Sequence, residues 1–117
     1  SSLFVDGTGH FGSQVTAASF LTPSDMRLKD QISTIHDAER MIHDLRGVRF
    51  RWKKSGLHDI GVIAQEVSTI IPEAVYMEDE KMMVSYDKLI PVLLQGFKSL
   101  QIRVVELEKQ VAALRRG

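Results

Sequence analysis

The sequence has no cysteine, no net charge and no long apolar run. Without cysteine the chain can form no disulfide, no thiolate nucleophile and no zinc site built from thiolates. Its 15 basic and 15 acidic residues balance, so no long-range field draws it to nucleic acid or to an anionic membrane. No apolar stretch approaches the roughly 18 residues that a bilayer span needs. We therefore expect neither nucleic acid nor a membrane as a partner.

Metal and cofactor sites are also not expected. The histidines are scattered and show no ligand spacing, so each is expected to be an ordinary surface or turn residue. They are His10, His36, His43 and His58. The sequence therefore predicts no metal site and no cofactor.

The length of 117 residues suits one small domain. A chain this short buries a modest fraction of its surface, so its stability gains much from association. We expect the protein to work as an oligomer.

The first 22 residues differ in pattern from the rest. Leu3 and Val5 alternate ahead of the turn signal Asp6-Gly7, and a second short strand pattern surrounds Val15. The segment has too few apolar residues to form a core of its own. We expect it to be a β-rich piece of a longer chain.

Residues 23–86 predict a compact α+β unit. A short helix is expected from the spacing of Ala38 to Leu45, with Asp37 as its cap and Gly47 as its stop. Alternating residues then predict a strand from Val48 to Lys53 that ends at Ser55-Gly56. A second helix is expected from near Ala64 to before Pro72. A hairpin follows, with Ala74 to Met77 and Met82 to Val84 flanking a polar turn.

From about residue 86 to 116 the sequence predicts one long helix with a heptad repeat. The apolar positions a and d are Ile90, Leu93, Phe97, Leu100, Val104, Leu107, Val111 and Leu114. Such a stripe is typical of a parallel coiled coil, in which Arg103 at g could pair with Glu108 of a neighbouring chain. The alternative is that Ile90 to Phe97 packs against the chain's own fold. Pro91 is tolerable if Asp87 caps the helix, and otherwise predicts a kink.

Four blocks of sequence resemble one known family. They are Ser24-Asp25-Met26-Arg27-Leu28-Lys29, Gly61-Val62-Ile63-Ala64-Gln65-Glu66-Val67, Pro72-Glu73-Ala74-Val75 and Tyr86-Asp87-Lys88-Leu89-Ile90-Pro91. Their order and spacing are similar to those of the intramolecular chaperone auto-processing domain, the peptidase S74 family of phage tail spikes, tail fibres and neck appendages. The resemblance covers nearly everything from Pro23 to Arg116.

The resemblance implies a serine peptidase that cuts its own chain once, with Ser24 as nucleophile and Lys29 as base. A serine hydroxyl needs such a base, and a lysine can serve only when its amine is neutral, which desolvation can achieve. Neither a regular helix nor a strand brings positions five apart together, so a turn or a contact between chains must do so. Asp25 would favour the ammonium form if it lay close, so we expect it to point toward Arg27 or a backbone donor.

The cut is expected at the Pro23-Ser24-Asp25 junction. Attack by the Ser24 hydroxyl on the preceding carbonyl closes a five-membered ring, whereas attack on its own carbonyl needs a four-membered ring. This favours the Pro23-Ser24 bond and leaves Ser24-Asp25 open. Further support for the site is expected from Arg27, from Gln65 as an oxyanion donor and from Glu66.

The resemblance further implies a domain order and an assembly. Residues 1–22 would end a β-rich passenger fibre, and residues 23–117 would form the chaperone domain with its long helix at about 86–116. Family members assemble three-fold passengers, so the partners are two more copies and the chain's own fibre. The expected trimer interface is Phe97, Leu100, Val104, Leu107, Val111 and Leu114.

The expected location is a virion tail fibre or spike assembled in the host cytoplasm, with the chaperone domain released after cleavage. Two alternatives stay open. One is a structural trimerisation cap that does not cleave, and the other is the related self-cleaving module of a membrane-tethered eukaryotic transcription factor.

Overall fold

The computed structural model describes residues 21–117. The chain divides into two units, the first ending at Ser33 and the second running from Thr34 to Gly117. The first unit is described over residues 21–33 and contains one 3₁₀ helix, η2 (Met26–Leu28). The β-rich fibre end expected in residues 1–22 falls almost wholly outside the described residues.

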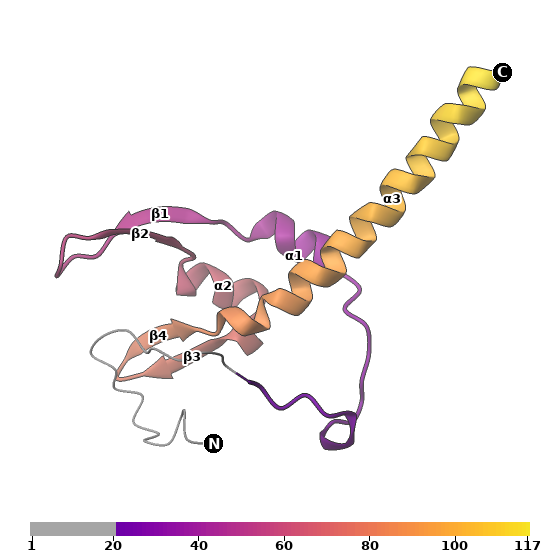
Figure 1. Ribbon diagram of the computed structural model, residues 1–117. Helices are drawn as coiled ribbons and strands as arrows, with labels where there is room; N and C mark the ends of the chain where they lie inside the picture. Colours follow the sequence, from indigo (N-terminus) through magenta and orange to yellow (C-terminus); the bar gives the residue numbers. More distant parts are fainter. Residues whose placement is uncertain (1–20) are drawn as a thin grey trace. The chain divides into compact units, whose positions relative to one another are not determined.

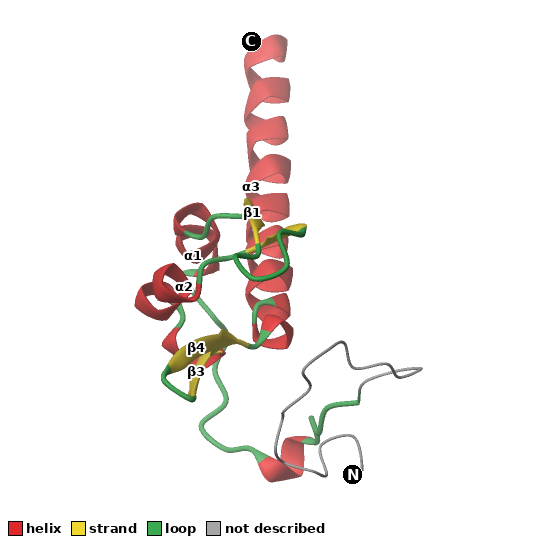
Figure 2. Ribbon diagram, turned by 90° about the vertical axis from the view of Figure 1, so that its left-hand side faces the viewer, coloured by secondary structure: helices red, strands yellow, loops and turns green. Residues whose placement is uncertain are grey.

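The second unit is mixed helix and strand, which confirms the expected α+β class. Its elements in chain order are α1 (Ala38–Asp44), β1 (Val48–Arg51), β2 (His58–Gly61), α2 (Ala64–Ile70), η3 (Pro72–Ala74), β3 (Val75–Glu78), β4 (Lys81–Val84), η4 (Tyr86–Lys88) and α3 (Ile90–Arg116). The strands form two separate antiparallel hairpins, and α2 lies between them (Figure 2).

Helix α1 packs across the first half of α3 (Figure 1). The close approach depends on Gly96, where a Cβ atom would come within 2.1 Å of Ile42 Cδ1 and 3.5 Å of the Ala38 carbonyl oxygen. A residue with a side chain at this position would push against α1. The crossing therefore sets α1 directly against the backbone of α3.

A small apolar core joins α1, α2, η3 and the start of α3. Its fully or nearly buried residues are Ala38, Val67, Ile71, Ala74, Leu89 and Val92. Among the residues that the structure describes, Val67 is the largest side chain that is fully buried. The predicted second helix is confirmed, and its apolar face is the one that this core buries.

The two hairpins differ in how well the sequence predicted them. The hairpin around Glu78 to Lys81 is confirmed, with Val75 paired to Val84, and its turn residues Asp79 and Glu80 both have positive φ. The strand beginning at Val48 is also confirmed. Its partner β2, which pairs Gly61 with Val48, was not predicted.

Of the three helix-end predictions, one is partly confirmed and two are wrong. Asp37 occupies the N-cap position of α1 as predicted, but its side chain makes no capping hydrogen bond. Gly47 does not end α1, because Leu45 already leaves the helix in an extended conformation. Asp87 does not cap α3, which begins at Ile90 after a separate 3₁₀ turn. Pro91 lies in the first turn of α3, where its missing N–H would have no intrahelical acceptor. The lost donor is thus accommodated at the helix start.

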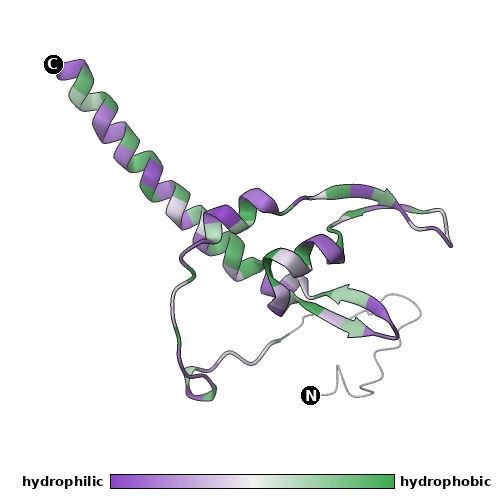
Figure 3. Cartoon of the chain, turned by 180° about the vertical axis from the view of Figure 1, so that it is seen from behind, coloured by the Kyte–Doolittle hydropathy of each residue, from purple (hydrophilic) through white to green (hydrophobic). Residues whose placement is uncertain are grey.

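The heptad stripe of α3 is exposed, and its apolar positions recur along the helix in Figure 3. Ile90 is 61% and Phe97 67% exposed, so the alternative that this stretch packs on the chain's own fold is wrong. The buried face of α3 contains Leu89, Val92 and Gly96 instead. The stripe is therefore available to a partner.

Candidate functional site

Ser24 and Lys29 meet across the 3₁₀ turn η2. Lys29 Nζ donates a hydrogen bond to Ser24 Oγ over 3.0 Å. Ser24 lies just before the turn and Lys29 ends it, so one tight turn closes the distance. The expectation that a turn would bring this pair together is thus met within one chain.

Local chemistry explains why the chain turns here. Asp25 is the N-cap of η2, and its Oδ1 accepts the backbone N–H of Arg27 over 2.8 Å. Backbone bonds from Leu28 to Asp25 and from Lys29 to Met26 complete the turn, at 3.0 and 3.1 Å. Short carboxylate side chains favour such caps because they satisfy free N–H groups at a helix start. Local contacts within residues 24–29 are therefore sufficient to form this turn.

The Asp25 carboxylate is bound by Arg27, which confirms its expected orientation. Arg27 Nε donates to Oδ1 over 3.1 Å and Nη2 donates to Oδ2 over 2.8 Å. The side-chain bonds from Arg27, followed by its backbone bond, lower the pKa of Asp25 below its ordinary value. The same pair raises the pKa of Arg27. Each group therefore favours the charged form of the other.

The turn lies at an exposed surface of the described chain. Every residue from 21 to 30 is exposed, including the apolar side chains of Met26 at 71% and Leu28 at 73%. Water therefore reaches Lys29, and its amine is the donor to Ser24. A general base must instead accept the serine proton, so the hydrogen bond has to reverse before chemistry can occur.

The other expected site residues lie in the second unit, at the start of α2. Glu66 accepts from Arg46, with Oε2 2.6 Å from Nη2 and Oε1 3.2 Å from Nε. The side-chain bonds of Arg46 lower the pKa of Glu66. The Gln65 residue is exposed, and its backbone carbonyl accepts a hydrogen bond from the Ser68 hydroxyl. A part for Gln65 or Glu66 in a site around Ser24 stays a prediction.

Two polar clusters of the second unit were not predicted. Glu39 of α1 accepts from both Ser99 and Arg103 of α3, and Lys88 donates to the hydroxyl of Tyr76 and to the carbonyl of Glu73. The members of each cluster lie far apart in sequence, so no local pattern marks them. The first cluster joins the helices α1 and α3, and the second joins η4 to η3 and to strand β3.

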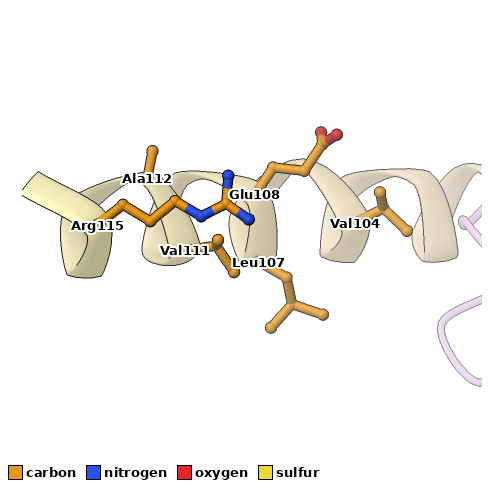
Figure 4. A pocket seen from close by; sticks show the side chains of 6 residues that line it. All are labelled: Val104, Leu107, Glu108, Val111, Ala112 and Arg115. Carbon is orange, nitrogen blue, oxygen red and sulfur yellow. The ribbon is translucent and has the colours of Figure 1, made fainter.

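The outer half of α3 carries a shallow apolar hollow of about 560 Å³. All of its lining comes from this one helix, as Figure 4 shows. The lining residues are Val104, Leu107, Glu108, Val111, Ala112 and Arg115. Val104, Leu107 and Val111 are apolar a or d positions of the heptad repeat, so the hollow is part of the exposed stripe.

Within residues 21–117, no group of three or more acidic, histidine or cysteine side chains is arranged to hold a metal ion. None of the helices in this part of the chain has both the length and the apolar composition of a membrane-crossing segment.

Comparison with known proteins gives one family and two relatives. Residues 24–76 match the family Peptidase S74, described as the chaperone of endosialidase. The long tail fiber proteins Gp37 of Enterobacteria phages K3 and T2 are each 29% identical to the chain over 118 residues. The alignments cover 92% of this chain but 10% and 9% of the relatives. The chain thus spans about a tenth of the length of the curated relatives it matches.

Proposed function

We propose that this chain is the chaperone domain of a phage tail fibre, which assembles three copies and then cuts itself free, because residues 24–76 match the chaperone of endosialidase family. The contact that carries the proposal is the 3.0 Å hydrogen bond between Lys29 Nζ and Ser24 Oγ. The fibre is proposed because two relatives are named long tail fiber proteins. The passenger is the segment of the same chain that precedes Pro23.

The proposed reaction breaks the Pro23-Ser24 bond. Ser24 Oγ attacks the carbonyl carbon of Pro23 while Lys29 Nζ takes the hydroxyl proton. As the C–N bond breaks, Lys29 returns this proton to the Ser24 nitrogen, and an ester joins the two residues. Water then hydrolyses the ester, which leaves a carboxylate on Pro23 and restores the Ser24 hydroxyl.

Assembly is proposed to switch this reaction on. Lys29 needs a neutral amine to act as base, and desolvation is what favours that form. The turn is exposed in the single chain, and Met26 and Leu28 beside Lys29 present apolar surface that a neighbouring chain can cover. Closure of three chains would then remove water from the amine.

The exposed heptad stripe of α3 is the proposed trimer interface. Its interface residues are Phe97, Leu100, Val104, Leu107, Val111 and Leu114, all of them exposed in the single chain. Burying an apolar stripe between helices is the main driving force of coiled coils. Three-fold assembly, rather than two-fold, is taken from the family's three-fold passengers.

Gln65 and Glu66 are proposed to support the site in the assembled state. An amide N–H₂ such as that of Gln65 can stabilise the oxyanion that forms on the Pro23 carbonyl. Glu66 keeps its charge beside Arg46 and can orient a cation of the site. A Gln65→Glu change, which removes the donor at nearly constant volume, is expected to slow cleavage.

The mass of the refolded chain tests the proposal. Wild-type protein should yield two fragments, residues 1–23 and 24–117, while Ser24→Ala and Lys29→Ala should yield none. Ser33→Ala, which changes an exposed serine of the same unit, is the matched control and should cleave normally. Fragments from Ser24→Ala would overturn the dyad. An intact wild-type trimer would support a structural cap that does not cleave.

A further inference from the structure

Asp25, Arg27 and Lys29 alternate along the Ser24 block, so one carboxylate has two possible cationic partners. Arg27 takes it through three bonds: its backbone N–H and Nε donate to Oδ1, and its Nη2 donates to Oδ2. Both oxygens of the Asp25 carboxylate therefore accept hydrogen bonds from Arg27. Lys29 donates its hydrogen bond to Ser24 instead.

The pairing of Asp25 with Arg27 rather than with Lys29 matters because Lys29 must lose its proton to act as a base. A carboxylate in contact with an amine favours the ammonium form, which is the wrong form for a base. A guanidinium holds a carboxylate in a fixed two-pronged geometry and never loses its own charge at working pH. Arg27 can thus neutralise Asp25 without being titrated itself.

We infer that Arg27 is a positioning residue for the proposed self-cleavage, because by holding both oxygens of Asp25 it keeps that carboxylate from pairing with Lys29. The inference rests on the proposed function. The charged groups in the described part of this unit are Asp25, Arg27, Lys29 and Asp30. Asp25 is singled out because it also caps the turn that carries Ser24 and Lys29.

The test is the cleavage rate as a function of pH for four refolded proteins. Wild type is compared with Arg27→Gln, Asp25→Asn and the double variant. In Arg27→Gln the freed carboxylate should pair with Lys29. The pH of half-maximal rate should then rise by about one unit, and the rate at neutral pH should fall about tenfold.

The double variant separates positioning from a merely structural effect. Asparagine can still cap the turn but carries no charge, so Asp25→Asn should restore the pH midpoint of Arg27→Gln to near the wild-type value. Arg27→Lys, which keeps the charge but loses the two-pronged contact, should be intermediate. Helix content and oligomer mass of each variant confirm that it has folded.

The outcomes are distinct. If wild type cleaves and Arg27→Gln keeps the wild-type pH midpoint, the inference is overturned and the proposed function stands. A loss of rate in Arg27→Gln that Asp25→Asn does not restore also overturns it. If wild type yields no fragments at any pH, the proposed self-cleavage fails and this inference fails with it.

Discussion

Arg103 Nη1 of α3 donates to Glu39 Oε1 of α1 across 2.5 Å, and the Ser99 hydroxyl donates to the other oxygen of the same carboxylate. The pair fixes α1 across α3 beyond the close approach at Gly96. It also engages, within one chain, the arginine that the heptad pattern assigned to Glu108 of a neighbouring chain. Arg103 therefore holds α1 against α3 within one chain.

The Glu39 cluster should make stability depend on pH. Hydrogen bonds from Ser99 and then Arg103 lower the pKa of Glu39 from its ordinary 4.5. A carboxylate with a lowered folded-state pKa stabilises the fold above about pH 4.5 and loses that contribution as pH falls through its lower folded value. The midpoint of urea unfolding at fixed chain concentration should therefore fall on acidification below pH 4.5, and Glu39→Gln should weaken this dependence. Glu106→Gln, at an exposed position of α3, should leave it unchanged.

The core should be sensitive at Ile71, which is 5% exposed. Ile71→Ala removes buried methylene and methyl groups and leaves a cavity, so the free energy of unfolding should fall by about 2–5 kcal/mol. Ile102→Ala makes the same change at a residue that is 68% exposed, and should cost little. Chemical denaturation at one chain concentration measures both. Equal losses in the two variants would mean that Ile102 is covered in the assembly.

Leu107→Asp should break the oligomer. The change would bring three carboxylates into one buried layer of the proposed trimer, at a cost of several kcal/mol. Sedimentation should then report monomer or aggregate. Ile102→Asp is the matched control, because heptad position f faces away from the helix partners. An unchanged mass for Leu107→Asp would show that the stripe is not the interface.

Cleavage should require assembly, because the Ser24 turn is exposed in the single chain. The rate during refolding should rise with chain concentration, and Leu107→Asp should block cleavage as fully as Ser24→Ala. The two sites are far apart in sequence, so a local effect of Leu107 on the turn is not expected. A rate that does not change with concentration would uncouple assembly from proteolysis.

The sequence predicts those parts of the fold that have a local signal. Val48 and Phe50 alternate with exposed residues and mark β1, whereas β2 has three exposed residues in succession and no period-two pattern. Helix α2 was predicted from near Ala64, and Pro72 correctly indicated that the helix ends before it. Helix ends were predicted poorly, because a cap depends on whether a side chain finds a free N–H in three dimensions.

In the candidate site, too, contacts between residues close in sequence could be predicted and contacts between distant residues could not. The contact of Ser24 with Lys29 was expected from the family resemblance, and the pairing of Asp25 with Arg27 from their opposite charges; both contacts lie within one turn. The pairs Arg46 with Glu66 and Glu39 with Arg103 join residues 20 and 64 positions apart. Only tertiary packing brings such residues together, and no spacing rule reports it.

The outer half of α3 has a consequence for hydrogen exchange. Residues 104–111 of this helix lie beyond the contact of Arg103 with α1 and are all exposed in the single chain, and a short helical segment without packing is only marginally stable in water. Its backbone amides should therefore exchange quickly in a monomer and become protected only as chains associate. Amide protection in this segment would then measure the assembly equilibrium residue by residue, independently of whether any peptide bond is cut.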